Sequence, residues 1–152
     1  MNKYCNFRNY LNIGVLTLSL YFSGCGHNDK VYVSRVIDGD TIVLSTGEHV
    51  RLIGENTPEK KEYGFKEAKK RLEELVLNKE VQLEAEKRDK DKYGRLLRDV
   101  YINGIFVNEV MIEEGYAEVM IYSPDNKYEK IFRDARERHL ATHANGRCTK
   151  PH

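Results

Sequence analysis

The chain has 152 residues, of which 40% are hydrophobic, enough for one domain with its own buried core. Its 25 Lys and Arg residues nearly balance 24 Asp and Glu residues, so the formal net charge is +1. This balance disfavours a protein that holds nucleic acid through bulk positive charge. Any phosphate recognition must therefore be local, or assisted by a bound cation.

Residues 1–24 have the pattern of a secretory signal. Lys3 and Arg8 precede a mostly apolar run at 11–22, which is too short to span a bilayer as a helix. The segment Phe22 to Cys25 resembles the lipobox of bacterial lipoproteins, which implies cleavage before Cys25 and a lipid on that cysteine. We expect export across the cytoplasmic membrane and lipid anchoring at the cell surface or periplasmic face. Secretion without an anchor is the alternative.

The three cysteines are compatible with lipid anchoring and with secretion without an anchor. Cys5 leaves with the signal, Cys25 carries the lipid and Cys148 remains, so no intramolecular disulfide is expected. Without lipid on Cys25, a bridge to Cys148 is possible. Removal of the signal takes away bases only and leaves 23 Lys and Arg against 24 Asp and Glu. The remaining chain divides into a polar tether at 25–30, a folded domain at 31–145 and a tail at 146–152.

The hydrophobic pattern of the domain predicts both strands and helices. Alternating, β-branched segments predict strands at 31–37, 40–44, 50–53, 81–85 and 96–102, with Asp38-Gly39 as a two-residue hairpin turn. Helical spacing predicts helices at 61–77, at about 107–115 and at 127–143, and residues 117–121 fit a further extended segment. This order predicts an α+β fold: a five-stranded Greek-key barrel of the OB type packed against helices.

The segment 51–59 places polar groups where a strand ends. Arg51 offers a planar, permanently charged fork for a phosphate or carboxylate. Asn56 and the Thr57 carbonyl offer hard oxygen ligands, and Glu59 offers a carboxylate that could act as a base or metal partner. A strand that ends in a polar turn is common in any fold, so the weight of this segment depends on what surrounds it.

Two other segments could converge on this one. Asp40 starts the second predicted strand, and the turn before that strand can reach the same end of a barrel as the loop after the third. Two carboxylates, an amide oxygen and a carbonyl would form part of a Ca²⁺ shell completed by water. Arg95, after a charged loop and Gly94, could clamp a phosphate together with Arg51. By itself, the Asp-Gly-Asp-Thr pattern is more typical of a hairpin turn followed by the start of a strand.

Separate blocks of the chain resemble the staphylococcal nuclease (thermonuclease) family, in the order that the family has them. The blocks are Val36-Ile37-Asp38-Gly39-Asp40-Thr41, Arg51-Leu52-Ile53-Gly54 with Thr57-Pro58-Glu59, Asp91-Lys92-Tyr93-Gly94-Arg95, and Val107-Asn108-Glu109. The resemblance covers residues 31 to about 140. It implies an OB-fold barrel with three helices and Ca²⁺-dependent hydrolysis of DNA and RNA phosphodiesters to 3′-phosphate products.

The resemblance also implies roles for matching residues. Asp40 and the Thr57 carbonyl correspond to metal ligands, and Glu59 to the group that positions or deprotonates the attacking water. Arg51 and Arg95 correspond to the pair that holds the scissile phosphate. Lys92 and Tyr93 correspond to positions at which the family contacts substrate phosphate. Tyr122 corresponds to a tyrosine on which the family stacks a base.

Asn56 departs from the family pattern, which has a second aspartate ligand there. Asn keeps an oxygen but removes a negative charge, so we expect weaker Ca²⁺ binding. The acids elsewhere favour cleavage of single-stranded or frayed DNA and RNA over tight binding of long duplexes. We expect a monomer without an obligate protein partner. A competing hypothesis is a membrane-tethered OB-fold module, weakly active or inactive, that binds nucleic acid or protein.

Overall fold

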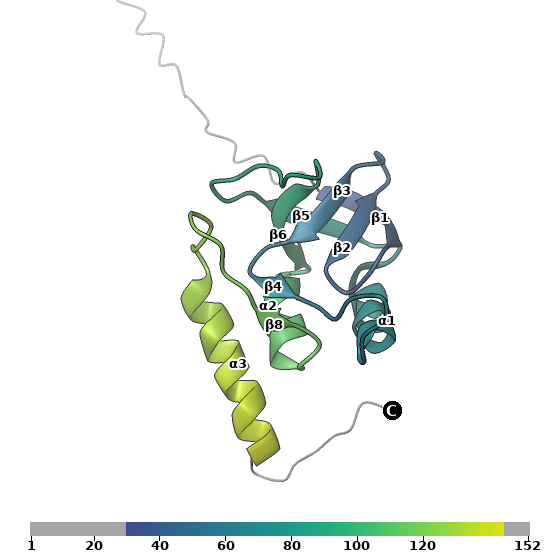
Figure 1. Ribbon diagram of the computed structural model, residues 1–152. Helices are drawn as coiled ribbons and strands as arrows, with labels where there is room; N and C mark the ends of the chain where they lie inside the picture. Colours follow the sequence, from purple (N-terminus) through teal and green to yellow (C-terminus); the bar gives the residue numbers. More distant parts are fainter. Residues whose placement is uncertain (1–29, 145–152) are drawn as a thin grey trace, which may run out of the picture.

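The computed structural model describes residues 30–144, and the predicted signal, Cys25 and Cys148 lie outside this range. The described residues form an α+β fold in which a small barrel is packed against helices (Figure 1). None of the helices in this part of the chain has the length and apolar character needed to cross a bilayer. The first strand begins at Lys30, the last residue of the predicted tether.

The barrel consists of β1 (Lys30–Val36), β2 (Thr41–Leu44), β3 (His49–Leu52), β5 (Glu80–Glu84) and β6 (Leu96–Ile102). Neighbouring strands pair in the order β3-β2-β1-β5-β6, and β3 pairs with β6 in parallel, which closes the barrel. A register shift in β1, between Val33 and Arg35, marks the bend that lets β1 pair with both β2 and β5. The predicted OB-type barrel is confirmed.

Short strands extend the barrel toward the helices. β7 (Ile105–Phe106) pairs with β6, while β4 (Glu55–Asn56) pairs antiparallel with β8 (Glu118–Val119). The β4–β8 pair connects the chain after β3 to the segment before the last helix. It thereby fixes the polar stretch that follows Arg51, and β8 corresponds to the extended segment expected at 117–121.

The three helices in the described residues are α1 (Phe65–Val76), α2 (Val107–Glu113) and α3 (Glu129–Ala144). Helix α1 begins at Phe65, four residues later than the predicted start, because Gly64 at its N-cap adopts a left-handed backbone with φ of 89°. Its buried face consists of Ala68, Leu72 and Val76. Helix α2 ends just before Gly115, as expected, and α3 packs against α2 (Figure 1).

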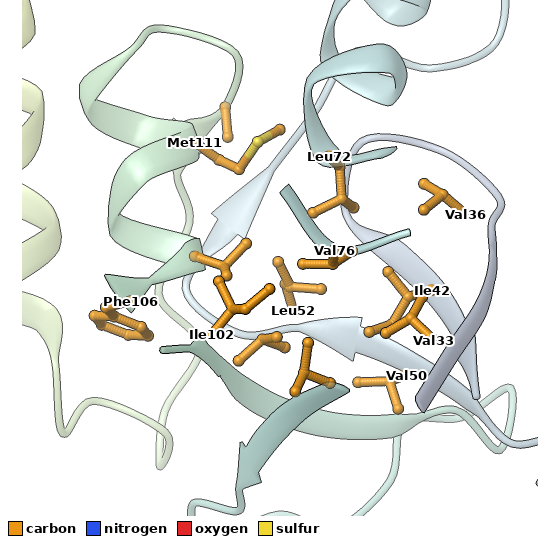
Figure 2. Packing of buried hydrophobic residues seen from close by; sticks show 14 of the residues in the cluster. Val33, Val36, Ile42, Val50, Leu52, Leu72, Val76, Ile102, Phe106 and Met111 are labelled. Carbon is orange, nitrogen blue, oxygen red and sulfur yellow. The ribbon is translucent and has the colours of Figure 1, made fainter. Parts of the chain in front are cut away.

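The core lies between the inner face of the barrel and helices α1 and α2. Figure 2 shows Leu72 and Val76 of α1 directed toward Val33, Ile42 and Leu52 of the strands.

Phe132 brings α3 onto this core, and its ring packs directly against the backbone of Gly54. A Cβ added to Gly54 would lie only 2.1 Å from the Phe132 ring. Gly54 also has a φ of +79°, a backbone conformation that residues with a side chain rarely adopt. Both space and backbone therefore require glycine at this position, between β3 and β4.

The turn between β1 and β2 differs from the predicted two-residue hairpin. β1 ends at Val36 and β2 begins at Thr41, so residues 37–40 form a wider connection, across which the Ile37 amide donates to the Thr41 carbonyl at 2.9 Å. Gly39 is needed here for space, because a Cβ would lie 2.8 Å from both Ala68 and Thr57. The prediction was wrong because it assigned the glycine to turn geometry, whereas its role is close packing of this turn against α1 and the 57–59 segment.

Candidate functional site

A cleft of about 730 Å³ lies at the barrel end where β2 begins and β3 ends. It is formed by the β1–β2 turn, the segment after β3, the loop between β5 and β6, and the segment before α3. Every side chain that the sequence proposed for the site lines this cleft, namely Asp40, Arg51, Asn56, Thr57, Glu59, Lys92, Tyr93, Arg95 and Tyr122. The structure thus brings the separate segments together, as expected, although their individual roles remain proposals.

Arg51 is fixed at the floor of the cleft. It pairs with Thr41 across the β2–β3 ladder, and its guanidinium forms an ion pair with Asp40. Its Nη2 also donates to the carbonyl of Glu55 and to Oδ1 of Asn56, each at 3.2 Å. Burial opposes the charge of Arg51, but Asp40 and Glu55 outweigh it and raise the pKa of the guanidinium above its usual value. Arg51 therefore stays charged and stays in place.

Arg95 reaches the same place from the loop that precedes β6. Gly94, with φ of 83°, allows the tight turn in which Asp91 Oδ1 accepts from the Arg95 amide at 3.0 Å. Arg95 Nε donates to Asp91 Oδ2 at 2.7 Å, and its Nη1 donates to the Thr41 hydroxyl at 3.1 Å. Burial alone would raise the pKa of Asp91, but these bonds from Arg95 outweigh it and lower that pKa.

The Thr41 hydroxyl connects the two arginines. It accepts from Arg95 and donates to Asp40 Oδ1 at 2.9 Å, while Asp40 is the ion-pair partner of Arg51. The two guanidinium groups are therefore held in one hydrogen-bonded chain that runs across the cleft. Such preorganised donors suit an anion with several acceptor oxygens, which is the chemistry of a phosphate.

The oxygen donors near Asp40 suit a hard cation. The Thr57 amide lies 3.4 Å from Asp40 Oδ2, and the Asp40 amide lies 3.2 Å from Asp38 Oδ1. Burial and the neighbouring Asp40 raise the pKa of Asp38 above its usual value, and a cation would relieve this repulsion. Within the described residues no group of three or more His, Cys, Asp or Glu side chains has the arrangement of a metal centre. Any cation here must rely on amide, carbonyl and water oxygens beside its carboxylates.

The remaining predicted residues lie at the rim. Glu59 is exposed, and its amide donates to Glu62 Oε2 at 2.7 Å. Tyr93 and Tyr122 are exposed by 73% and 57%, so both rings are accessible from solvent. Lys92 Nζ lies 4.9 Å from the centre of the Tyr93 ring. The rim thus combines exposed aromatic rings with positive charge.

Sequence reasoning missed two carboxyl groups near the site, the half-buried Asp38 and the buried Glu55. Asp38 lines the cleft beside Asp40, and the Asp-Gly-Asp pattern could have revealed it. Glu55 is 2% exposed, and both of its carboxylate oxygens lack a hydrogen-bond partner among the described residues. Burial, reinforced by Asp40, raises the pKa of Glu55 well above its usual value. Nothing in the sequence signalled this burial, because Glu55 follows a glycine and precedes a polar turn.

Comparison with known proteins agrees with this geometry. A family model described as staphylococcal nuclease homologue matches residues 49–143. The chain is 36% identical over 141 residues to a thermonuclease of Staphylococcus hyicus, which covers 84% of this chain and 83% of that protein. It is 37% identical over 119 residues to a thermonuclease of Staphylococcus intermedius, covering 72% of this chain and 70% of the relative.

A match from another genus has a different length. The chain is 44% identical over 116 residues to the endonuclease YncB of Bacillus subtilis, which covers 68% of this chain but only 54% of YncB. The barrel, the cleft and these matches together define a phosphodiester hydrolase. The chain belongs to the staphylococcal nuclease homologue family.

Proposed function

We propose that this protein is a Ca²⁺-dependent nuclease that hydrolyses phosphodiester bonds of DNA, RNA or both and leaves 3′-phosphate ends. The observation that supports this proposal best is the chain of contacts from Arg95 through Thr41 and Asp40 to Arg51 across one cleft. These contacts hold two guanidinium groups in positions from which both can bind one phosphate. Glu59 at the rim of the same cleft supplies a carboxylate for the attacking water.

In this mechanism Arg51 and Arg95 bind the non-bridging oxygens of the scissile phosphate and stabilise the negative charge that builds on them. Glu59 orients a water molecule and accepts its proton as the water oxygen bonds to phosphorus. The bond from phosphorus to the 5′ oxygen breaks, the departing oxygen gains a proton, and the phosphate stays on the 3′ side. Asp91 keeps the Arg95 fork aligned throughout.

The donor set fits a hard divalent cation. Asp40, the side-chain oxygen of Asn56 and the carbonyl of Thr57 would hold Ca²⁺, with water completing the shell. When bound, the cation supplies positive charge beside the phosphate. This local charge explains how a chain with nearly balanced acids and bases can bind a polyanion. Single-stranded or frayed DNA and RNA are the proposed substrates, because one phosphodiester has to enter the cleft.

The test compares the purified protein with Glu59→Gln and Arg95→Ala on denatured DNA, in Ca²⁺ and in chelator. We expect fragments with 3′-phosphate ends in Ca²⁺, almost none in chelator, and losses of at least about 10²-fold in both variants. Mass spectrometry of the products identifies their ends. Fragmentation that persists in chelator would refute the Ca²⁺ dependence, and binding without fragments would favour the inactive module.

We also propose that the mature protein is exported and anchored to the membrane through a lipid on Cys25. The basis is the signal-like segment 1–24 and the lipobox-like residues before Cys25. Metabolic labelling with a fatty acid should label the wild type and leave Cys25→Ser unlabelled. Equal partition of both forms into the aqueous phase would refute the anchor and favour free secretion.

A further inference from the structure

Arg88 lies on the cleft wall, outside the sequence blocks that carry the family resemblance. It belongs to the loop between β5 and β6, and the segment before α3 rises toward this loop (Figure 1). Asp125, 1% exposed, joins the two segments. Its Oδ1 accepts from the amides of Lys87 at 3.0 Å and Arg88 at 2.9 Å, and its Oδ2 forms an ion pair with Arg88 Nε.

This support fixes one edge of the Arg88 guanidinium and leaves the other edge open. The terminal nitrogens Nη1 and Nη2 have no hydrogen-bond partner in the range that the structure describes, and the side chain is 41% exposed. Arg51 and Arg95, in contrast, each use a terminal nitrogen inside the protein. Arg88 is thus held by Asp125 through Nε, and the N–H donors of its terminal nitrogens are left for a ligand.

Asp125 also contacts Tyr122, so it connects Arg88 with this tyrosine. The Asp125 amide donates to the Tyr122 carbonyl at 2.9 Å, and the Arg88 guanidinium carbon lies 5.9 Å from the centre of the Tyr122 ring. Arg88 therefore lies next to an aromatic ring that also lines the cleft. A planar fork beside an exposed ring matches a nucleotide, whose phosphate accepts two parallel hydrogen bonds while its base has a face to stack.

We propose that Arg88, positioned by Asp125, forms a phosphate subsite separate from the phosphate contacts expected of Lys92 and Tyr93, and that it binds a phosphate next to the scissile one in an oligonucleotide. The inference rests on the proposed nuclease function and specifies its substrate: a strand with at least two phosphates in the cleft. The simpler role for Arg88 is neutralisation of the buried Asp125. That role alone predicts no dependence on the number of phosphates in the substrate.

The kinetic test uses two substrates, a single-stranded oligothymidylate and a nitrophenyl ester of a nucleoside phosphate with a single phosphodiester. In Arg88→Ala we expect KM for the oligonucleotide to rise about tenfold with little change in kcat, the size of a lost charge-assisted hydrogen bond. Both constants should stay unchanged for the single phosphodiester. Lys87→Ala is the matched control, because it removes a neighbouring charge that does not line the cleft.

The binding test uses a fluorescent oligothymidylate in chelator, so that it does not depend on cleavage. Arg88→Ala should weaken binding and lower the slope of log affinity against log salt by about one, whereas Lys87→Ala should change affinity less than about twofold. Arg88→Lys keeps the charge without the fork, and we expect it to retain the slope with intermediate affinity. Arg88→Lys also provides the test of the subsite if Arg88→Ala does not fold.

The outcomes separate the inference from the function on which it rests. If the wild type cleaves neither substrate, the nuclease proposal fails, and the binding test still decides whether Arg88 contacts a phosphate. The subsite proposal would be overturned if Arg88→Ala and Lys87→Ala had the same KM for the oligonucleotide. An equal rise in KM on both substrates would also overturn it, because it would show a general disturbance of the cleft.

Discussion

Asp91 and Asp99 lie on either side of the start of β6, in opposite electrostatic surroundings. Asp91, at the cleft, accepts hydrogen bonds from Arg95 that outweigh burial and lower its pKa. Asp99 is fully buried, and neither of its oxygens has a hydrogen-bond partner in the described part of the chain. Burial, reinforced by Glu86 and Glu84, raises the pKa of Asp99 to about 8.

The difference shows how this fold distributes its charges. Nearly equal numbers of acids and bases do not produce uniform pairing: three arginines line the cleft, whereas the carboxyl groups of Glu84, Glu86 and Asp99 lie near one another at β5 and β6. Arginines pair with the carboxylates of Asp40 and Asp91 in the cleft. Asp99 can remain buried without a partner because it can keep its proton and stay neutral. The first region suits the binding of an anionic ligand, and the second should make stability depend on pH.

Removal of the arginine at the floor of the cleft should have the largest effect. Arg51→Ala leaves Asp40 buried without its ion-pair partner, so we expect a loss of about 3 kcal/mol in the free energy of unfolding. We also expect a fall in kcat of at least about 10²-fold. Urea denaturation and cleavage assays measure the two effects. Arg133→Ala, which breaks an exposed pair with Glu129 on α3, is the control and should change both little.

Asp99→Asn tests the other region. The pKa of Asp99 is raised in the folded protein, so between about pH 4 and 8 the folded state binds more protons than the unfolded state. The wild type therefore loses stability as pH rises through this window, by up to about 1.4 kcal/mol per pH unit from this group. Asp99→Asn removes that contribution. The free energy of unfolding of the variant, relative to that of the wild type, should therefore increase from about pH 5 to about pH 9. Parallel urea stability curves would contradict the assignment.

The sequence predicted most of the barrel and the cleft because both depend on local patterns and ordered blocks. Alternation revealed the main strands, and the blocks around Asp40, Arg51 and Arg95 predicted a shared site. The turn at Gly39 was misplaced because close packing, rather than local turn preference, decides it, whereas α1 begins late because of the left-handed backbone of Gly64. A glycine alone does not tell whether it serves a backbone angle or a close approach.

Other features could not be predicted because they join residues distant in the chain. Arg88 and Asp125 are 37 residues apart, and neither stands out in a charged loop or a helix-preceding turn. Asp99 occupies a strand position where only the closed barrel reveals that Glu84 and Glu86 lie nearby. Pairing and burial of charges are thus the properties that need the three-dimensional structure.

Asn56→Asp should strengthen the acidic side of the cleft by a smaller amount. An additional charge among the proposed ligands should lower the Ca²⁺ concentration for half-maximal activity, by about tenfold for an interaction of about 1.4 kcal/mol. Isothermal titration with Ca²⁺ provides a second measurement without substrate. Asn103→Asp adds the same charge at the remote turn before β7 and should leave both values unchanged. A half-saturation value that stays equal or rises in Asn56→Asp would refute Asn56 as a ligand position.

The smallest effect is expected for an arginine–carboxylate pair outside both regions. Arg71 of α1 donates to Glu114 through Nε at 2.5 Å and Nη2 at 2.7 Å, a bidentate contact, whereas the Arg95 side chain donates to Asp91 through Nε alone. The side chain of Arg71 is 27% exposed and that of Glu114 is 37% exposed, so water competes for both charges. We therefore expect Arg71→Ala to cost less than about 1 kcal/mol in urea denaturation, and less still in high salt. A cost equal to that of Arg51→Ala would show that pairing geometry, rather than burial, sets the difference between arginines inside and outside the cleft.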